Sequence, residues 1–514
     1  MKTPIYKILQ STVLLFISLI LIQCGNKHDV IFPEPFSIVV DDMGWMEGSD
    51  LSDKNGPYRL GFDRILERRD YRPFIAIGEK LGIRFQGSFI ISEFDKENIL
   101  ANYPGTTEFG TKWDNSSRNI DSLNGIMDYI KKNAAYLEFG IHGIRHEFWD
   151  NGIAKRAEWY DMFGGKPWQD SDITNHINCF KAIMNQYGIN KENGQSFPES
   201  FVPTAYAFYW NPEEDNSTAA FMSKMGVKYA NTDMRFIEHQ NPPMLKGGGI
   251  DHGVHFLHRR QYGNDWNEIA KLPDANFERF ETDPIEAHWT NFLSEKTSEQ
   301  DSLNNAWILY LKRIQKSKSH YLAKNTEQLH SQWFYKKYSK ITQLKGSVAI
   351  IDNTNMPKEV YQQGLLGNMV LAIRLKPGEH LSKGIINDEP IAAYFESSGY
   401  AYIYLPVLER KVYTFEYTVD DHQMRTFVNN TGTYNIYNFS NSGDKISINL
   451  RMYGTQEVNI KCFQPDTVFT DNPHLQILDQ SYDSKTGFLT LKVYGRDMQG
   501  EKGILRIERF QISD

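Results

Sequence analysis

Two clusters of side chains in the sequence could together bind a metal ion. Asp41 and Asp42 end an apolar run, and much further along the chain a second apolar run leads into His142 and His146, which are four residues apart. Neighbouring carboxylates are costly to bury unless a cation lies beside them. Two histidines and one carboxylate are a common ligand set for catalytic zinc. We therefore expect Asp42, His142 and His146 to bind a divalent metal ion and Asp41 to act as a general base.

Each cluster alone also fits a purely structural role. Two histidines four residues apart occur as core or capping residues. An Asp-Asp pair can cap a helix or lie in a solvated turn. Because both clusters end an apolar strand within an α/β pattern, the metal site is the favoured interpretation.

The elements that would position these residues alternate between strand-like and helical patterns. The predicted strands are 36–40, 83–91, 136–142, 200–206, 227–231, 253–258 and 285–288, and the predicted helices are 122–132, 172–187, 217–225, 302–315 and 326–338. Such alternation predicts a mostly parallel sheet, with a (β/α) barrel as the leading architecture. Active sites of parallel barrels lie at the C-terminal ends of the strands, where both clusters fall.

The pattern changes near residue 345. No tryptophan follows Trp333, and short alternating strands separated by polar turns replace the helices. This pattern predicts an all-β sandwich over residues 346–514, after a catalytic barrel over residues 25–345. A carbohydrate-binding role and a purely structural role for the sandwich both remain open.

Residues 1–24 have the features of a targeting segment. Lys2 and Lys7 precede an apolar stretch that ends at Cys24. The stretch is shorter than the roughly 20 apolar residues that a spanning helix needs. It resembles a bacterial lipoprotein signal, which implies lipidation of Cys24 and a membrane-anchored protein outside the cytoplasm, periplasmic or on the cell surface. A plain secretory signal and a membrane anchor are the alternatives.

The net charge and the cysteine content limit the possible binding partners and disulfides. The net charge is −8 and the sequence has no basic tract, so we expect no nucleic-acid partner. Cys179 and Cys462 could form one disulfide, but two distant cysteines are not a disulfide framework.

The two clusters also carry a family resemblance. Val40-Asp41-Asp42-Met-Gly-Trp45 followed by His142-Gly-Ile-Arg-His146 resembles the polysaccharide deacetylase family, carbohydrate esterase family 4, over residues 36–340. The resemblance implies a distorted (β/α) barrel and a divalent metal, usually zinc, held by Asp42, His142 and His146. It also implies that Asp41 is the base and that the substrate is an acetylated carbohydrate.

The family's third motif is incomplete in this chain. That motif carries an arginine that orients the base, and a backbone N–H that binds the oxyanion. Its counterpart here is Phe201-Val-Pro203-Thr204, which lacks the arginine. We expect Arg145 or Arg235 to substitute, and a backbone N–H near Pro203–Thr204 to bind the oxyanion.

The family's last motif is a strand that ends in a histidine acting as general acid. The order of the predicted elements favours His288, and His258 is the rival. Either histidine could instead be a hydrogen-bonded core residue.

Aromatic residues at or just after the predicted strand ends could form a sugar-binding groove. Aromatic side chains more often fill cores, so each of them also fits a packing role. These residues are Trp45, Trp149, Tyr206, Trp210 and Trp289.

Two other functions remain open at this stage. A glycoside hydrolase or another C–N hydrolase could use the same barrel, since a fold does not determine a reaction. Glycosidic cleavage needs two separated carboxylates, and Glu147 or Asp233 could supply the second. Alternatively, the missing arginine fits a catalytically inactive glycan-binding surface lipoprotein.

Overall fold

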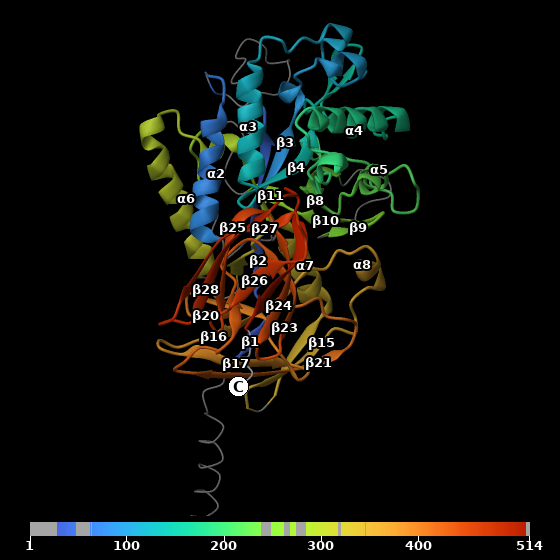
Figure 1. The fold of residues 1–514 in the computed structure, drawn as a ribbon. Coiled ribbons are helices and arrows are strands. Elements are labelled where there is room, and N and C mark those ends of the chain that lie inside the picture. The colour runs from blue at the N-terminus through green and yellow to red at the C-terminus, as the bar shows by residue number, and fades with distance from the viewer. Residues whose placement is uncertain are drawn as a thin grey trace, which may run out of the picture.

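The computed structural model describes residues 28–47, 62, 64–237, 248–261, 268–273, 284–316, 320–344 and 346–509. These residues form a mixed α/β part and a β-rich part (Figure 1). Cys24 and the rest of the predicted signal lie outside the described residues. Within the described ranges, we find no helix with the length and apolar character required to cross a bilayer.

The α/β part is built on a mostly parallel sheet that curls into a half-barrel. Its strand order is β11 (Arg260–Gln261), β12 (Pro284–His288), β2 (Glu34–Met43), β3 (Phe85–Ile90), β4 (Leu137–Gly143), β7 (Ser200–Phe201), β8 (Tyr229–Thr232), β10 (Val254–His258) and β9 (Gly248–Asp251). Neighbours pair in parallel except β10 with β9, and β13 (His320–Leu322) also pairs with β2. The C-terminal ends of β2, β4 and β12 therefore meet at one edge of the sheet.

The curl of the sheet is visible in the pairing of two successive strands. β10 pairs with β8 at one end of the strand order, and β11 pairs with β12 at the other end. Only Arg259 separates β10 from β11 along the chain. The two ends of the sheet therefore approach each other at Arg259.

Helices surround this curled sheet. In Figure 1, α2 (Arg72–Leu81), α3 (Ile120–Lys132) and α6 (Gln300–Gln315) lie on the left of the α/β part, and α4 (Asp170–Asn185) and α5 (Thr218–Met225) lie on the right. The predicted helices and most predicted strands are confirmed, with ends that differ by a few residues. The predicted strand 200–206 was too long, because Ala205 and Tyr206 adopt positive φ angles of 50° and 63° and break it into a short helical turn.

The β-rich part consists of several sheets that are antiparallel except where β19 pairs with β22. The largest contains β1 (Val30–Ile31), β16 (Met369–Arg374), β20 (Tyr400–Leu405), β19 (Ala393–Ser397), β22 (Phe427–Asn429), β25 (Gly454–Lys461), β28 (Phe488–Gly495) and β27 (Leu475–Asp483). A second contains β14 (Lys340–Gln343), β15 (Val348–Asp352), β21 (Val412–Asp420), β17 (His380–Ile386) and β18 (Glu389–Pro390). A third contains β23 (Asn435–Asn441), β24 (Lys445–Met452), β29 (Glu501–Glu508) and β26 (Thr467–Thr470). Because β1 precedes β2 in the chain, the polypeptide passes through the β-rich part before it enters the α/β sheet.

Buried polar contacts join the two parts. Helix α7 (Thr326–Tyr338) lies between them, and Arg451 of β24 donates to Glu327 Oε2 of this helix over 2.7 Å. Arg84, ahead of β3, donates to the carbonyl oxygen of Met498 over 2.9 Å. Buried, hydrogen-bonded contacts of this kind leave little freedom for the parts to move independently.

The two cysteines do not form the disulfide that the sequence allowed. Cys179 lies in α4 and Cys462 follows β25, and both thiols are free and buried. The parts are therefore held by packing and hydrogen bonds.

Candidate metal centre

The C-terminal end of β2 brings two adjacent carboxylates to one place. Neighbouring side chains of a regular strand point to opposite faces of the sheet. Here the register of β2 against β3 shifts between Val40 and Met43, and Asp42 adopts a φ of 60°. Asp41 and Asp42 are both buried, with exposed fractions of 3% and 1%, and both face the same group of histidines. A strained backbone at a functional cluster is a common arrangement.

The end of β4 supplies the first of these histidines. The Nδ1 atom of His142 lies 2.7 Å from the carbonyl oxygen of Val202, which can only accept, so Nδ1 carries the proton. The other ring nitrogen, Nε2, then has its lone pair free and lies 3.4 Å from Asp42 Oδ1. The hydrogen bond to the β7 end thus fixes the ring orientation of His142.

The predicted second histidine joins the same cluster. His146 has a φ of 70°, and its ring centroid lies 5.5 Å from that of His142. One potential ligand atom each from Asp42, His142 and His146 lies within 4.8 Å of the others. The structure therefore brings together the three residues that the sequence suggested as metal ligands.

The surroundings of these three residues fit a bound cation. Asp42 Oδ1 is buried and, within the described part of the chain, has no hydrogen-bond partner. It faces Nε2 of His142, the ring nitrogen that the hydrogen bond to Val202 leaves for a ligand, so a cation between the two atoms would satisfy both. His146 Nδ1 lies 3.1 Å from Glu147 Oε1, an outer carboxylate of the kind that commonly orients metal-binding histidines. The buried Asp/His triad could therefore hold a divalent metal ion.

The charges in the cluster perturb the acidities of its members. Burial alone raises the pKa of Asp42, but the adjacent ring and charge of His142, with smaller effects of His288 and His146, bring the pKa well below its ordinary value. Burial lowers the pKa of His142, but Asp41 and Asp42 outweigh it and raise the pKa. Asp42 is therefore ionised at neutral pH, as a metal-binding carboxylate must be.

The segment between the two histidines is fixed by a buried glutamate. Both carboxylate oxygens of Glu158 lie 2.9 Å from the backbone nitrogen of Ile144, and Oε1 lies 2.9 Å from His176 Nδ1. A Cβ atom on Gly143 would lie only 2.2 Å from Glu158 Oε2, so glycine is needed at this close approach. Nothing in the sequence pattern pointed to Glu158.

Arg259 holds Asp41. Its Nη1 and Nη2 atoms donate to Asp41 Oδ1 and Oδ2 over 2.9 and 2.5 Å, and its Nη2 lies 3.5 Å from Glu286 Oε2. A two-pronged pair of this kind fixes the orientation of a carboxylate. Arg259 follows the predicted strand 253–258 directly, and this position was the one signal that could have identified it.

The arginines that we expected to replace the missing one have other partners. Arg145 donates to Glu108 Oε1 over 2.6 Å, and Arg235 pairs with Asp233. The prediction that one of these two arginines orients Asp41 was wrong, because the curl of the sheet brings Arg259 to Asp41 instead.

Burial and the charge of Arg259 act in opposite directions on the pKa values of the two carboxylates beside this arginine. Burial raises the pKa of Asp41, but the charge of Arg259 and then that of His142 outweigh it, so the pKa is below its ordinary value. Burial raises the pKa of Glu286, and this effect prevails over Arg259. Asp41, Glu286 and His288 also have potential ligand atoms within 4.8 Å of one another, but the Arg259 guanidinium already contacts both carboxylates of this group.

His288, at the end of β12, belongs to the cluster. Its Nε2 atom lies 3.7 Å from Asp42 Oδ2 and 3.8 Å from Glu286 Oε1. The rival, His258, lies outside both groups of potential ligands, and its Nδ1 accepts a hydrogen bond from the backbone of Met234 over 3.1 Å. The structure thus brings His288, and not His258, to the carboxylates.

The predicted aromatic residues divide into two groups. The ring of Trp45 lies 6.2 Å from that of His146, and Tyr206 donates its hydroxyl to Glu286 Oε1 over 2.6 Å. Trp210 packs against Phe256 with ring centroids 5.8 Å apart, and Trp149 lies buried in the hairpin formed by β5 (Phe148–Asp150) and β6 (Ile153–Lys155). Trp289 is fully buried and donates its indole N–H to the carbonyl oxygen of Asp70 over 3.0 Å. Trp45 and Tyr206 are therefore the two that lie against the cluster.

Comparison of the chain with family models and with curated proteins identified no similar protein. None of the protein-family models matches the chain, and the search of curated proteins found no match either. The geometry of the cluster is therefore the basis for assigning its function.

Proposed function

We propose that this protein is a metal-dependent hydrolase that removes N-acetyl, or O-acetyl, groups from a carbohydrate. The observation that carries the proposal is the buried set of Asp42, His142 and His146, with Asp41 and His288 beside it. The fold we propose is a distorted (β/α) barrel of the polysaccharide deacetylase type, followed by an accessory β-sandwich.

The residues around the triad have properties suited to hydrolysis. A divalent ion such as Zn²⁺, held by Asp42, His142 and His146, would act as a Lewis acid on the acetyl carbonyl. Asp41, ionised and oriented by Arg259, accepts a proton from the attacking water. His288, close to the ends of two carboxylates, gives a proton to the departing amine.

The arrangement is less suited to glycosidic cleavage. Glycosidases place two carboxyl groups about 5–9.5 Å apart on either side of the scissile bond. Here the carboxylates of Asp41 and Glu286 share one guanidinium, because Arg259 contacts both, and so they are paired with the same cation and not placed on either side of a substrate bond. This observation favours the deacetylase over the glycosidase alternative.

We also propose that Cys24 is lipidated and that the protein acts outside the cytoplasm. The support is the sequence that precedes Cys24, and metabolic labelling with a fatty-acid analogue tests it. A Cys24→Ser variant should lose the label and leave the membrane fraction.

Acetate release from a panel of acetylated glycans tests the proposed reaction. We expect release that a chelator abolishes and added zinc restores. Asp41→Asn should retain zinc and lose about 10²–10⁴-fold in kcat, because a general base contributes that much. His142→Ala should lose the bound metal, measured by elemental analysis.

His258→Ala is the matched control, since His258 lies outside the cluster. Full activity in Asp41→Asn would remove its role as base, and zinc retained by His142→Ala would remove that ligand. Metal binding without acetate release from any glycan would favour the inactive glycan-binding alternative.

A further inference from the structure

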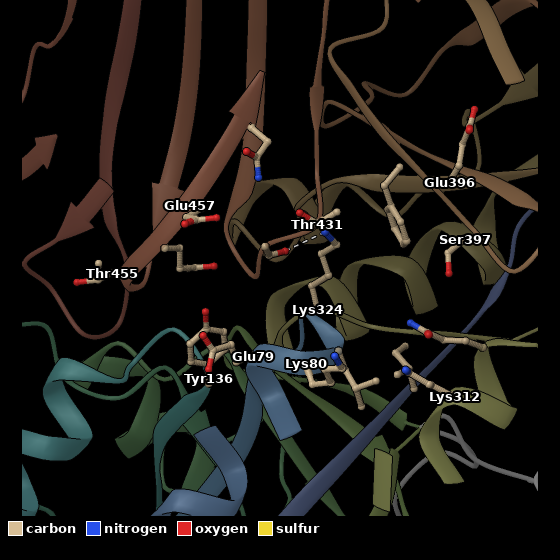
Figure 2. A pocket seen from close by; sticks show the side chains of 18 of the residues that line it. Glu79, Lys80, Tyr136, Lys312, Lys324, Glu396, Ser397, Thr431, Thr455 and Glu457 are labelled. Atoms are coloured by element: carbon tan, nitrogen blue, oxygen red, sulfur yellow. Dashed lines mark hydrogen bonds between the residues drawn. The ribbon is translucent and has the colours of Figure 1, made fainter. Parts of the chain in front are cut away.

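A polar pocket of about 620 Å³ lies where the α/β part meets the β-rich part (Figure 2). Its α/β side is formed by the ends of α2 and α6, by Tyr136 and by the residues after β13. Its β-rich side is formed by the end of β19, by β25 and β28, and by residues 431–432. The volume lies within the range of about 300–1,000 Å³ that is usual for pockets binding small ligands.

The pocket is separate from the candidate metal centre. Tyr136 precedes β4, whereas His142 lies at the other end of that strand. The seven residues of β4 span roughly 20 Å at about 3.3 Å per residue. A ligand in the pocket would therefore not touch the Asp/His cluster.

The pocket is held open by contacts between the two parts. Gly82, with a φ of +65°, lies against the carbonyl oxygen of Thr431, where a Cβ atom would come within 2.2 Å. Lys324, 3% exposed, donates to the carbonyl oxygens of Asn430 and Gly432. These contacts cross the junction, so the pocket is formed before any ligand binds.

The charges of the pocket nearly balance. Among the described residues that line it are Glu79, Glu396, Glu457, Lys80, Lys312, Lys324 and Lys492. Lys80 and Lys312 lie in the last turns of α2 and α6, so the negative ends of two helices face this region. A phosphate ligand would instead need helix N-termini or a glycine-rich loop. The balance therefore favours a ligand without strong net charge.

The remaining lining combines aromatic rings with hydroxyl and amide groups. Figure 2 shows Tyr136 below Thr455 and Glu457 on one side of the pocket, Ser397 on the other, and Lys324 between them. Phe395 supplies a second, half-buried ring 5.0 Å from the Lys324 ammonium. Sugar rings present apolar C–H faces and many hydroxyl groups. The two aromatic rings can pack against the C–H faces, and the surrounding lysine, glutamate, hydroxyl and amide groups can hydrogen-bond to the hydroxyls.

We propose that this pocket is a second carbohydrate-binding site, which takes a hydroxyl-rich oligosaccharide segment. The site is built jointly by both parts of the chain and needs no metal. It would hold a glycan independently of the Asp/His cluster, so its occupancy does not depend on the proposed hydrolase activity.

Isothermal titration calorimetry of the purified protein in EDTA tests the proposal. The probes are chitotetraose, cellotetraose and, as the acidic arm, tetragalacturonate. We expect at least one neutral tetrasaccharide to bind. Phe395→Ala and Tyr136→Ala should each weaken binding about tenfold, as truncation of a central aromatic contact does.

Phe469→Ala is the matched control, because Phe469 is an exposed ring on β26 away from the pocket. Ser397→Trp fills the pocket without removing a packed side chain and should abolish binding even if an alanine variant folds poorly. Asp42→Asn should bind like the unaltered protein. Binding by none of the probes, binding of tetragalacturonate alone, binding that Ser397→Trp leaves unchanged, or binding lost in Asp42→Asn would overturn the proposal.

Discussion

At the scale of single residues, the metal-binding set could be predicted because its members are close in sequence or end recognisable strands. Asp42 lies just after the predicted strand 36–40, His142 ends the predicted strand 136–142, and His146 follows four residues later. Arg259 could not be assigned in this way, because its pairing with Asp41 joins residues 218 positions apart. That contact depends on the curl of the sheet, which no local pattern specifies.

Arg259→Lys should keep the positive charge but lose the bidentate hydrogen bonds to Asp41. Lysine is a point charge that cannot reproduce the planar fork of arginine. We expect zinc content to stay the same and acetate release to fall at least about 100-fold, because a misplaced catalytic group has an effect of that size. Elemental analysis and steady-state kinetics measure the two quantities.

Arg235→Lys serves as the control for this variant, since Arg235 pairs with Asp233 at a neighbouring strand end. A further variant, Arg259→Gln, should also lower the free energy of unfolding by about 3–5 kcal/mol, because it leaves two buried carboxylates without their cation. Normal activity in Arg259→Lys would show that Asp41 needs no such support.

At the scale of elements, the positions of the strands and helices could be predicted from the sequence, whereas the conformations of the turns between them could not. The mainly apolar stretches 36–40 and 136–142 became β2 and β4, because strands of a parallel sheet are buried on both faces and are therefore rich in apolar residues. The turn after β4 instead depends on Glu158, which hydrogen-bonds the backbone of Ile144 from a distant position. Backbone hydrogen bonds to a distant side chain leave no periodic signal.

Glu158→Gln should loosen the turn that carries both histidines. The amide places an NH₂ group where a carboxylate oxygen now lies 2.9 Å from the Ile144 nitrogen, and it removes the negative charge that strengthens the contacts to Ile144 and His176. We expect zinc affinity to fall roughly 10–100-fold, as loss of outer support for a metal site does. The free energy of unfolding should fall by about 1–3 kcal/mol. Competition with a chromogenic chelator measures the affinity, and denaturant titration measures the stability.

Gly143→Ala provides an independent test of the same turn, because its Cβ atom would meet Glu158 Oε2 at 2.2 Å. Both variants should weaken zinc binding. If both bind zinc as the unaltered chain does, the turn does not need this support.

At the scale of the whole molecule, a partly buried ion pair between Glu199 and Arg451 connects the α/β part to the β-rich part. Glu199, just before β7, accepts from Arg451 of β24 over 2.7 Å and from Lys228 over 2.9 Å. Burial raises the pKa of Glu199, but Arg451 and Lys228 outweigh it and lower the pKa to about 2. The sequence predicted both parts but not this pairing between them, since neither partner is marked by a local pattern.

Acid should therefore weaken the connection between the parts. The pKa of Glu199 is lower in the folded chain than in the unfolded chain, so its stabilisation is complete above pH 4.5 and is lost as the pH falls towards about 2. The loss is on the order of 3 kcal/mol. Glu199→Gln should be less stable at neutral pH and should show a flatter pH dependence between pH 5 and about 2.

Denaturant titrations across this pH range measure the effect, with Glu192→Gln, an exposed neighbour in sequence, as the control. Parallel stability curves for Glu199→Gln and the unaltered chain would show that this ion pair does not link the two parts.

The pairing of β1 with β16 has a mechanical consequence for a lipidated chain. His28, whose Nδ1 lies 2.7 Å from the carbonyl oxygen of Arg374, fixes the polypeptide to the β-rich part only four residues after Cys24. Four residues reach at most about 14 Å. The ten residues of β2, which span roughly 33 Å, then carry the chain from the β-rich part into the α/β part (Figure 1), and Asp41 and Asp42 lie near the end of this strand. In a protein tethered at Cys24, the β-rich part would therefore lie next to the bilayer. The Asp/His cluster would lie on the side of the molecule away from the bilayer, where it could meet glycans beyond the lipid headgroups.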